Sequence, residues 1–353
     1  MSLNEIRIEN LTQPLLAWYE ENKRTLPWRG TTDPYRIWVS EIMLQQTRVE
    51  AVIPYYERFL KALPAISDLA ECGEDRLLKL WEGLGYYSRV RNMQKAAKKL
   101  VQEHDGEMPQ DYDEVLALPG IGPYTAGAIT SIAFGVASPA VDGNVLRVLA
   151  RAADDATDIL SAAMKKRVTD MLLAAMPKAC PGVFNQALMD LGACVCLPNG
   201  VPKCQQCPWK PQCLALKRGT VDELPVRIKK TKRRTEERTV LLVMDGERVL
   251  LHKRPPQGLL AGLYELPNIE GSLSENDAVE NVRQMQLDPM YIEVLADAKH
   301  LFSHIEWRMK GYLVRVADAG TFSGDEDYFL VEKETIRKDF SIPSAFAAYL
   351  AYI

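Results

Sequence analysis

Hydrophobic and polar positions along the chain follow two different patterns. From about residue 10 to residue 195, apolar residues recur at the three-to-four spacing of amphipathic helices, interrupted by helix start and stop signals. Asp33 followed by Pro34 is typical of a helix start, and Gly83 and Gly85 after the run LLKLWE are typical of a helix end. The first part of the chain is therefore predicted to be all-α.

After about residue 235 the apolar runs become short and strand-like. RTVLLVM and RVLLHKR flank Asp245 and Gly246, which together are a strong signal for a tight β-hairpin. Residues 274–286 are predicted to be helical, 291–317 to form two or three strands, and 343–353 to form a closing helix. We therefore expect a multidomain protein. An all-α domain (1–217) and a linker (218–235) would precede an α+β domain (236–353).

The composition is that of an ordinary globular protein. The 353 residues are 47% apolar and 25% charged, which excludes a disordered or collagenous chain and suits two domains. The net charge of −4, taken alone, disfavours a nucleic-acid binder. However, residues 1–234 hold 31 basic and 27 acidic residues, whereas residues 235–353 hold 12 and 20. A basic half is thus joined to an acidic one.

The predicted linker contains a run of basic residues. Six of the eight residues in RIKKTKRR are basic: Arg227, Lys229, Lys230, Lys232, Arg233 and Arg234. Such a run is either a solvated linker or a strap that contacts DNA phosphates. The uncharged stretch 115–141 is broken by prolines and glycines, so a buried helix between turns is expected rather than a membrane span. Because the N-terminus shows no export signal, we expect a cytoplasmic protein without a membrane partner.

Three segments of the helical part carry candidate chemistry. In LPGIGPYTAG (118–127), Gly120 and Gly122 join two helices, either as a plain helical hairpin or as a turn whose N–H groups bind a phosphate. Asp142 precedes the next helix, as a helix cap or as a carboxylate fixed for catalysis. Glu41 lies on an otherwise apolar helix face. It is either a buried acid with a partner or a general acid whose pKa is raised by desolvation.

Five of the seven cysteines lie between Cys194 and Cys213. In Cys196-x7-Cys204-x2-Cys207-x5-Cys213 the spacing suits a metal site in a reducing compartment, with zinc and an iron–sulfur cluster equally compatible. Cys194 is the rival of Cys196 for the first ligand position.

Five motifs in order carry a resemblance to a known family. They are SEIMLQQT (40–47), GLGYYSRVRN (83–92), LPGIGPYTAG (118–127), VDGNVLRVLAR (141–151) and FNQALMDLGA (184–193). The chain resembles the MutY family of adenine DNA glycosylases, in the helix-hairpin-helix superfamily, from about residue 10 to its C-terminus. The resemblance implies a monomeric enzyme that removes adenine mispaired with 8-oxoguanine or guanine from double-stranded DNA.

The resemblance also implies roles for individual residues. Glu41 would protonate the adenine, and Asp142 would stabilise the oxocarbenium-like sugar or bond to it covalently. Tyr124 and Asn144 would support the sugar intermediate. Tyr124 stands where relatives of the endonuclease III type have a Schiff-base lysine, which implies a monofunctional glycosylase. The implied adenine pocket comprises Arg24, Trp28, Arg29, Leu44 and Gln186.

The implied DNA contacts lie in both domains. In the helical domain they are Gln46, Thr47, Tyr87, Gly120 and Gly122, of which Gln46 and Tyr87 would enter the duplex. Residues 236–353 resemble the nudix fold of a MutT-like domain but lack the glutamate-rich box that binds magnesium. They are therefore expected to recognise 8-oxoguanine, through Phe302, Ser303 and His304, and not to act as a pyrophosphohydrolase.

The resemblance further implies a [4Fe–4S] cluster on Cys196, Cys204, Cys207 and Cys213, in a loop at about 194–213. Two alternatives remain beside the adenine glycosylase: an endonuclease III-like glycosylase with lyase activity, and a non-catalytic iron–sulfur DNA-binding protein.

Overall fold

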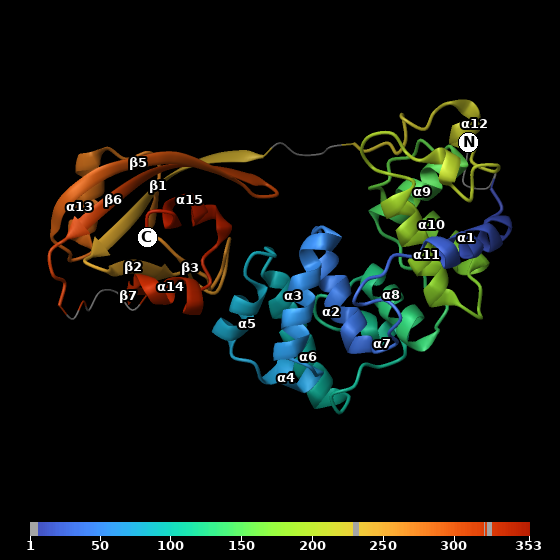
Figure 1. Ribbon diagram of the computed structural model, residues 1–353, viewed down its shortest axis with the longest axis horizontal. Coiled ribbons are helices and arrows are strands. Elements are labelled where there is room, and N and C mark those ends of the chain that lie inside the picture. Colours follow the sequence, from blue (N-terminus) through green and yellow to red (C-terminus); the bar gives the residue numbers. More distant parts are fainter. Residues whose placement is uncertain (1–5, 229–232, 321, 323–326) are drawn as a thin grey trace. The chain divides into compact units, whose positions relative to one another are not determined.

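The computed structural model describes residues 6–228, 233–320, 322 and 327–353 (Figure 1). The chain separates into two compact units: Met1–Glu71 with Ser88–Lys229, and Cys72–Tyr87 with Lys230–Ile353. In these described ranges, no helix has the length and apolar character needed to span a membrane.

The first unit is built from helices, as predicted. They are α1 (Glu9–Asn22), α2 (Pro34–Leu44), α3 (Val49–Ala62), α4 (Ile66–Glu71), α6 (Ser88–Glu103), α7 (Tyr112–Leu116), α8 (Pro123–Phe134), α9 (Gly143–Ala153), α10 (Ala162–Ala175), α11 (Pro181–Cys194), the 3-10 turn η2 (Cys204–Gln206) and α12 (Leu214–Arg218). A core of buried apolar side chains, including Leu15, Leu149 and Leu188, joins α1, α9, α10 and α11. The helices that carry Asn144 and Gln186, α9 and α11, are therefore fixed by a common core.

Local sequence signals place the helices as expected. Asp33 caps α2 by accepting hydrogen bonds from the backbone N–H groups of Tyr35 and Arg36. Gly127 lies in the middle of α8, where a Cβ would be only 2.3 Å from the carbonyl oxygen of Pro139. Because only glycine permits this approach, the segment that leads to Asp142 can lie directly against the helix that begins with Pro123.

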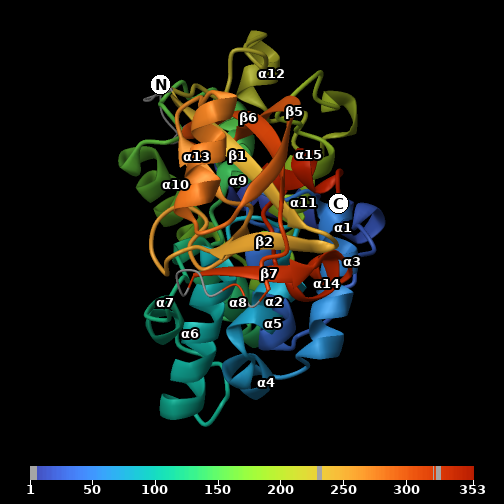
Figure 2. The ribbon, with the colours of Figure 1, turned by 90° about the vertical axis from the view of Figure 1, so that its left-hand side faces the viewer.

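The second unit contains a mixed β-sheet, which confirms the α+β prediction. Its elements are α5 (Glu74–Trp81), β1 (Arg234–Asp245), β2 (Arg248–Lys253), β3 (Tyr264–Glu265), β4 (Asn268–Glu270), α13 (Glu275–Gln284), β5 (Pro289–Leu301), β6 (Ile305–Val316), β7 (Tyr328–Glu332), α14 (Lys333–Asp339), the 3-10 turn η3 (Ser344–Phe346) and α15 (Ala347–Leu350). The main path is β3-β2-β1-β6-β5, with β4 on β1. Strand β7 lies beside β2 (Figure 2). The predicted hairpin forms between β1 and β2, and Gly246 has a φ of 58°.

Both faces of this sheet are covered. One face packs on Phe346 and Tyr349 near the C-terminus, and the other packs on Ala278 and Val282 of α13. Coverage on both sides explains why β1 contains a run of six buried residues instead of an alternating pattern. The predicted closing helix at 343–353 is wrong in extent, since only η3 and the single turn α15 form.

Helix α5 belongs to the sheet unit although it lies between helices of the first unit in sequence. The Tyr264 hydroxyl donates to Asp75 Oδ1 at 3.1 Å, and Lys79 Nζ donates to the carbonyl oxygen of Phe340 at 3.0 Å. The Ile342 N–H donates to Glu82 Oε1 at 3.1 Å. The sequence boundaries did not anticipate this exchange, because helical periodicity does not reveal which core a helix joins.

The basic run of the linker is described only at its ends, because Lys229, Lys230 and Lys232 lie outside the described residues. Arg233 Nε donates to the carbonyl oxygen of Phe302 at 3.1 Å, and Arg234 begins β1.

Candidate active site

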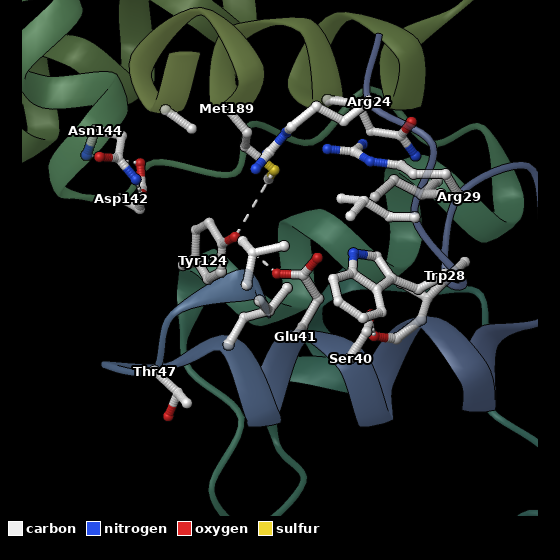
Figure 3. Close-up of a pocket in the computed structure, with 17 residues that line it drawn as sticks. Arg24, Trp28, Arg29, Ser40, Glu41, Thr47, Tyr124, Asp142, Asn144 and Met189 are labelled. Atoms are coloured by element: carbon white, nitrogen blue, oxygen red, sulfur yellow. Dashed lines mark hydrogen bonds between the residues drawn. The ribbon is translucent and has the colours of Figure 1, made fainter. Parts of the chain in front are cut away.

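One cavity in the first unit gathers side chains from several helices and from the segment before α2 (Figure 3). Its volume of about 180 Å³ is below the roughly 300–1,000 Å³ of pockets for drug-sized ligands, and so suits a single base. Its lining consists of Arg24, Leu26, Trp28, Arg29, Ile37, Ser40, Glu41, Leu44, Thr47, Val49, Tyr124, Ile132, Asp142, Asn144, Gln186, Met189 and Ala193. The structure thus brings together every residue expected to be catalytic and every residue expected to line the adenine pocket.

Glu41 is a buried acid with a single neutral hydrogen-bond donor. Only 6% of its surface is exposed, and the Tyr124 hydroxyl donates a 2.7 Å hydrogen bond to its Oε2 (Figure 3). Burial raises the pKa of Glu41, the Tyr124 hydrogen bond and the charge of Arg29 oppose this rise, and the charge of Asp142 adds to it. The carboxyl group therefore holds its proton at a higher pH than a solvated glutamate, as a general acid requires.

Asp142 is both a helix cap and a cavity residue. Its Oδ1 accepts from the backbone N–H groups of Asn144 and Val145 at 2.9 and 2.8 Å, and its Oδ2 accepts from Asn144 Nδ2 at 2.7 Å. Burial raises the pKa of Asp142, while these donors oppose the rise by stabilising its charged form. Asp142 therefore caps α9 as expected, and the cap also holds its carboxylate at the cavity, while its catalytic role stays a prediction.

A second buried carboxylate, which the sequence analysis missed, orients the two arginines of the cavity. Asp190 on α11 is fully buried and accepts from Arg24 Nη2 at 2.6 Å and from Arg29 Nη2 at 2.9 Å. This arrangement neutralises the aspartate and fixes both guanidinium groups. The signal that singled out Glu41, an acid on an apolar helix face, is also present at Asp190 in FNQALMDLGA.

Two other contacts define the side of the cavity formed by α11. The Tyr19 hydroxyl of α1 donates to Gln186 Oε1 at 2.8 Å, so the amide nitrogen is the group that Gln186 can offer to a base. Met189 Sδ lies 3.8 Å from the Tyr124 hydroxyl. Met189 and Tyr19 were not expected from the sequence, because apolar helical positions carry no sign of which side faces a cavity.

The glycine turn before α8 has the predicted geometry. Gly120 has a φ of 77°, and a Cβ there would lie 2.5 Å from the Cβ of Asn92. Gly122 occupies the N-cap position of α8, and Pro123 is its first residue. The turn therefore depends on glycine and presents backbone N–H groups at a helix start.

Tyr87, which is expected to enter the duplex, is buried, with 8% of its surface exposed. Its neighbour Tyr86 is 47% exposed and has a left-handed backbone with a φ of 48°. Gln46 is also exposed, with a φ of 59°, and Thr47 lies at the cavity. The pattern GLGYY does not indicate which of the two tyrosines is exposed.

Phe302, Ser303 and His304 form the turn between β5 and β6. The Phe302 ring packs edge-to-face on Trp307 with centroids 5.0 Å apart, whereas Ser303 and His304 are exposed. Ser303 Oγ and His304 Nδ1 lie within hydrogen-bond distance at 3.1 Å. An apolar anchor thus supports two exposed polar side chains at a hairpin tip.

The four predicted cysteine ligands surround one apolar cavity. Cys196, Cys204, Cys207 and Cys213 all line it, whereas Cys194, the last residue of α11, does not. In the described part of the chain, no group of three or more His, Cys, Asp or Glu side chains is arranged to hold one metal ion.

Helix α9 links the cysteine segment to the carboxylate site. The buried Arg147 donates to Asn144 Oδ1 at 3.0 Å, to the Gly192 carbonyl at 2.8 Å and to the Cys196 carbonyl at 2.9 Å. One turn later, Arg151 donates to Cys196 Sγ at 3.4 Å. The partner of Asp142 and the backbone of the cysteine loop are therefore held by the same side chain.

Comparisons with known proteins identify both units. Residues 39–169 match the HhH-GPD superfamily of base excision DNA repair proteins, and residues 239–352 match the NUDIX domain. An adenine DNA glycosylase of Mus musculus is 36% identical over 86% of this chain and 70% of its own length. One from Buchnera aphidicola (subsp. Baizongia pistaciae) is 37% identical over 83% of this chain and 82% of its own length. The chain belongs to the adenine DNA glycosylases.

Membership makes the protein an N-glycosylase of base excision repair and confirms the predicted family and fold class. A solved thermostable thymine-DNA glycosylase is also similar, with 26% identity and a TM-score of 0.55, covering 60% of this chain and 97% of that chain. The helical architecture is thus shared with a glycosylase that is named for a different base.

Proposed function

We propose that the glycosylase hydrolyses the N-glycosidic bond of adenine opposite 8-oxoguanine or guanine in duplex DNA, without efficient strand cleavage. The observation that carries this proposal is the pair of carboxyl groups at one base-sized cavity. Glu41 is buried beside a phenol, whereas Asp142 accepts three hydrogen bonds. Two carboxyl groups in such different environments suit an acid and an anionic stabiliser, as in glycoside hydrolysis.

In the proposed mechanism the adenine leaves the base stack and enters the cavity, since a buried acid cannot reach it inside the duplex. Glu41 protonates the adenine and so makes it a better leaving group. Asp142 then stabilises the positive charge that develops on the sugar, directly or through a covalent intermediate, until water attacks. Tyr124 and Asn144 support these carboxyl groups through the hydrogen bonds that they donate.

The absence of strand cleavage follows from Tyr124. A phenol cannot form the imine that β-elimination requires. Burial and the charges of Glu41 and Asp142 raise the pKa of Tyr124 well above 10, so the hydroxyl stays a hydrogen-bond donor. The adenine itself would be enclosed by the cavity residues Arg24, Trp28, Arg29, Leu44 and Gln186.

Duplex recognition would use surfaces of both units. In the first unit, the turn at Gly120 and Gly122 would bind a backbone phosphate, and the exposed Gln46 would enter the space that the adenine leaves. Tyr86, which belongs to the second unit, is exposed and would also contact the duplex. In the second unit, the hairpin tip formed by Phe302, Ser303 and His304 would contact the 8-oxoguanine.

We also propose a [4Fe–4S] cluster held by Cys196, Cys204, Cys207 and Cys213. All four thiols line one apolar cavity, and this set of donors is the usual one for such clusters. When bound, the cluster would cross-link the loop and so support its fold. The residues of the chain, and not the cluster, carry out base excision in this proposal.

One experiment tests the proposed activity. The purified protein is incubated with a duplex that contains adenine opposite 8-oxoguanine, and strand breakage is measured with and without hot alkali. We expect breakage mainly after alkali, and none above background for an adenine:thymine duplex of the same sequence. Cleavage of a thymine-glycol duplex in place of the adenine duplex, or equal breakage without alkali, would contradict the proposal.

A further inference from the structure

Arg227 lies beside the helix that begins after Asp142, although it belongs to the predicted linker. Its Nη2 atom is 3.5 Å from the position that a Cβ on Gly143 would occupy, and Gly143 is the first residue of α9. The Arg227 side chain is exposed. The positive charge of Arg227 therefore lies next to Gly143, the residue that follows the proposed catalytic Asp142.

The backbone on both sides of Arg227 is attached to the first unit. The carbonyl of Leu224 accepts from Arg151 Nε at 2.8 Å, and the carbonyl of Val226 accepts from the Ile159 N–H at 3.1 Å. The N–H of Ile228 lies 3.5 Å from Asp158 Oδ1. These contacts restrict where the Arg227 guanidinium can be, which lowers the entropy cost of binding through it.

No described carboxylate neutralises this guanidinium. The structure gives Arg227 no ion pair or hydrogen bond with another described side chain. Asp142 is already satisfied by Asn144 and Val145. An anion supplied from outside would therefore be stabilised at Arg227.

The substrate carries such an anion at this place. A nucleotide whose sugar C1′ meets Asp142 has a phosphodiester on its 3′ and on its 5′ side, only a few bonds from the reacting carbon. We infer that Arg227 binds a phosphate that flanks the extruded adenosine and thereby holds its sugar at Asp142. This inference rests on the proposed function and makes Arg227 a positioning residue of the catalytic site.

Single-turnover excision from the adenine:8-oxoguanine duplex tests the inference in the full-length protein. We expect Arg227→Ala to slow excision roughly 10- to 100-fold, the range for one lost charge-assisted hydrogen bond. The slope of log DNA affinity against log salt concentration should decrease in magnitude by the amount expected for about one phosphate contact. Arg227→Lys should recover much of both effects. The matched control is Lys165→Ala, which removes an exposed cation on α10 that does not line the cavity.

Neutral methylphosphonate linkages, placed singly at either side of the target adenosine, separate a phosphate contact from a structural role. On one of the two modified duplexes, wild type and Arg227→Ala should release adenine at similar rates, because the neutral linkage has already removed the phosphate charge that Arg227 contacts. An Arg227→Ala defect that stays the same on both modified duplexes, or no defect on the unmodified one, would overturn the inference. Failure of the wild-type protein to release adenine would instead overturn the proposed function.

Discussion

Replacing Glu41 by glutamine tests the proposed acid most directly. Glutamine keeps the shape of the side chain and an oxygen that can accept from the Tyr124 hydroxyl, but it has no proton to give at neutral pH. General acid catalysis contributes roughly 10²- to 10⁴-fold, or about 3–5 kcal/mol at about 1.4 kcal/mol per factor of ten. We expect the upper end of this range in single-turnover excision. The cavity offers no replacement, because Asn144 and Gln186 are amides and Asp142 is engaged as a cap.

The pH dependence provides a second measurement on the same variant. Since burial raises the pKa of Glu41, the acid form persists above the usual range of a glutamate and is lost as the pH rises through the raised value. The wild-type excision rate should therefore decrease as the pH rises through the raised pKa of Glu41. The rate of the glutamine variant should not show this decrease.

Stability should change in the opposite direction from activity. A raised pKa in the folded state means that the folded protein binds the Glu41 proton more tightly than the unfolded chain does. This proton therefore stabilises the fold, and its contribution to the free energy of unfolding is complete below the unfolded pKa of about 4.3. It decreases as the pH rises through the pKa of the folded state. At pH 7.5 the Glu41→Gln variant should thus melt at or above the wild-type temperature, and the difference should shrink near pH 4. Wild-type excision rates in the variant, or a variant that melts well below wild type at pH 7.5, would refute the reasoning.

Five other substitutions test three separate features. Arg147→Met removes the three hydrogen bonds that a buried side chain donates, so we expect the free energy of unfolding to fall by roughly 3 kcal/mol in chemical denaturation, together with a slower excision rate. Tyr87→Ala should destabilise the fold by about 3 kcal/mol as loss of a buried aromatic side chain, while Tyr86→Ala should change stability by less than about 0.5 kcal/mol and slow excision from duplex DNA. Cys196→Ser should lower the iron content and the visible absorbance of the purified protein, and Cys194→Ser should leave both unchanged.

The features that the sequence predicted well are local ones. The Asp33 cap, the turn at Gly120 and the hairpin at Gly246 each depend on a few neighbouring residues, and all three form as expected. The placement of α5 in the sheet unit was not predictable, because it depends on Asp75 meeting Tyr264 across 189 positions of sequence. Periodicity gives the face of a helix that is buried, but it does not name the partner that buries it.

The two buried carboxylates show the same limit at the site itself. Glu41 and Asp190 are both acids on apolar helix faces, so composition and spacing describe them alike. The fold separates them through their partners: Asp190 receives two guanidinium groups, and Glu41 receives one phenol. Two guanidinium groups offset the desolvation of Asp190. At Glu41 burial raises the pKa, and the single hydrogen bond from Tyr124 opposes this rise without cancelling it. Contacts with distant residues therefore distinguish Asp190, the structural acid, from Glu41, the proposed catalytic acid. The decisive contacts are those of Arg24 and Arg29, which reach Asp190 from the segment between α1 and α2.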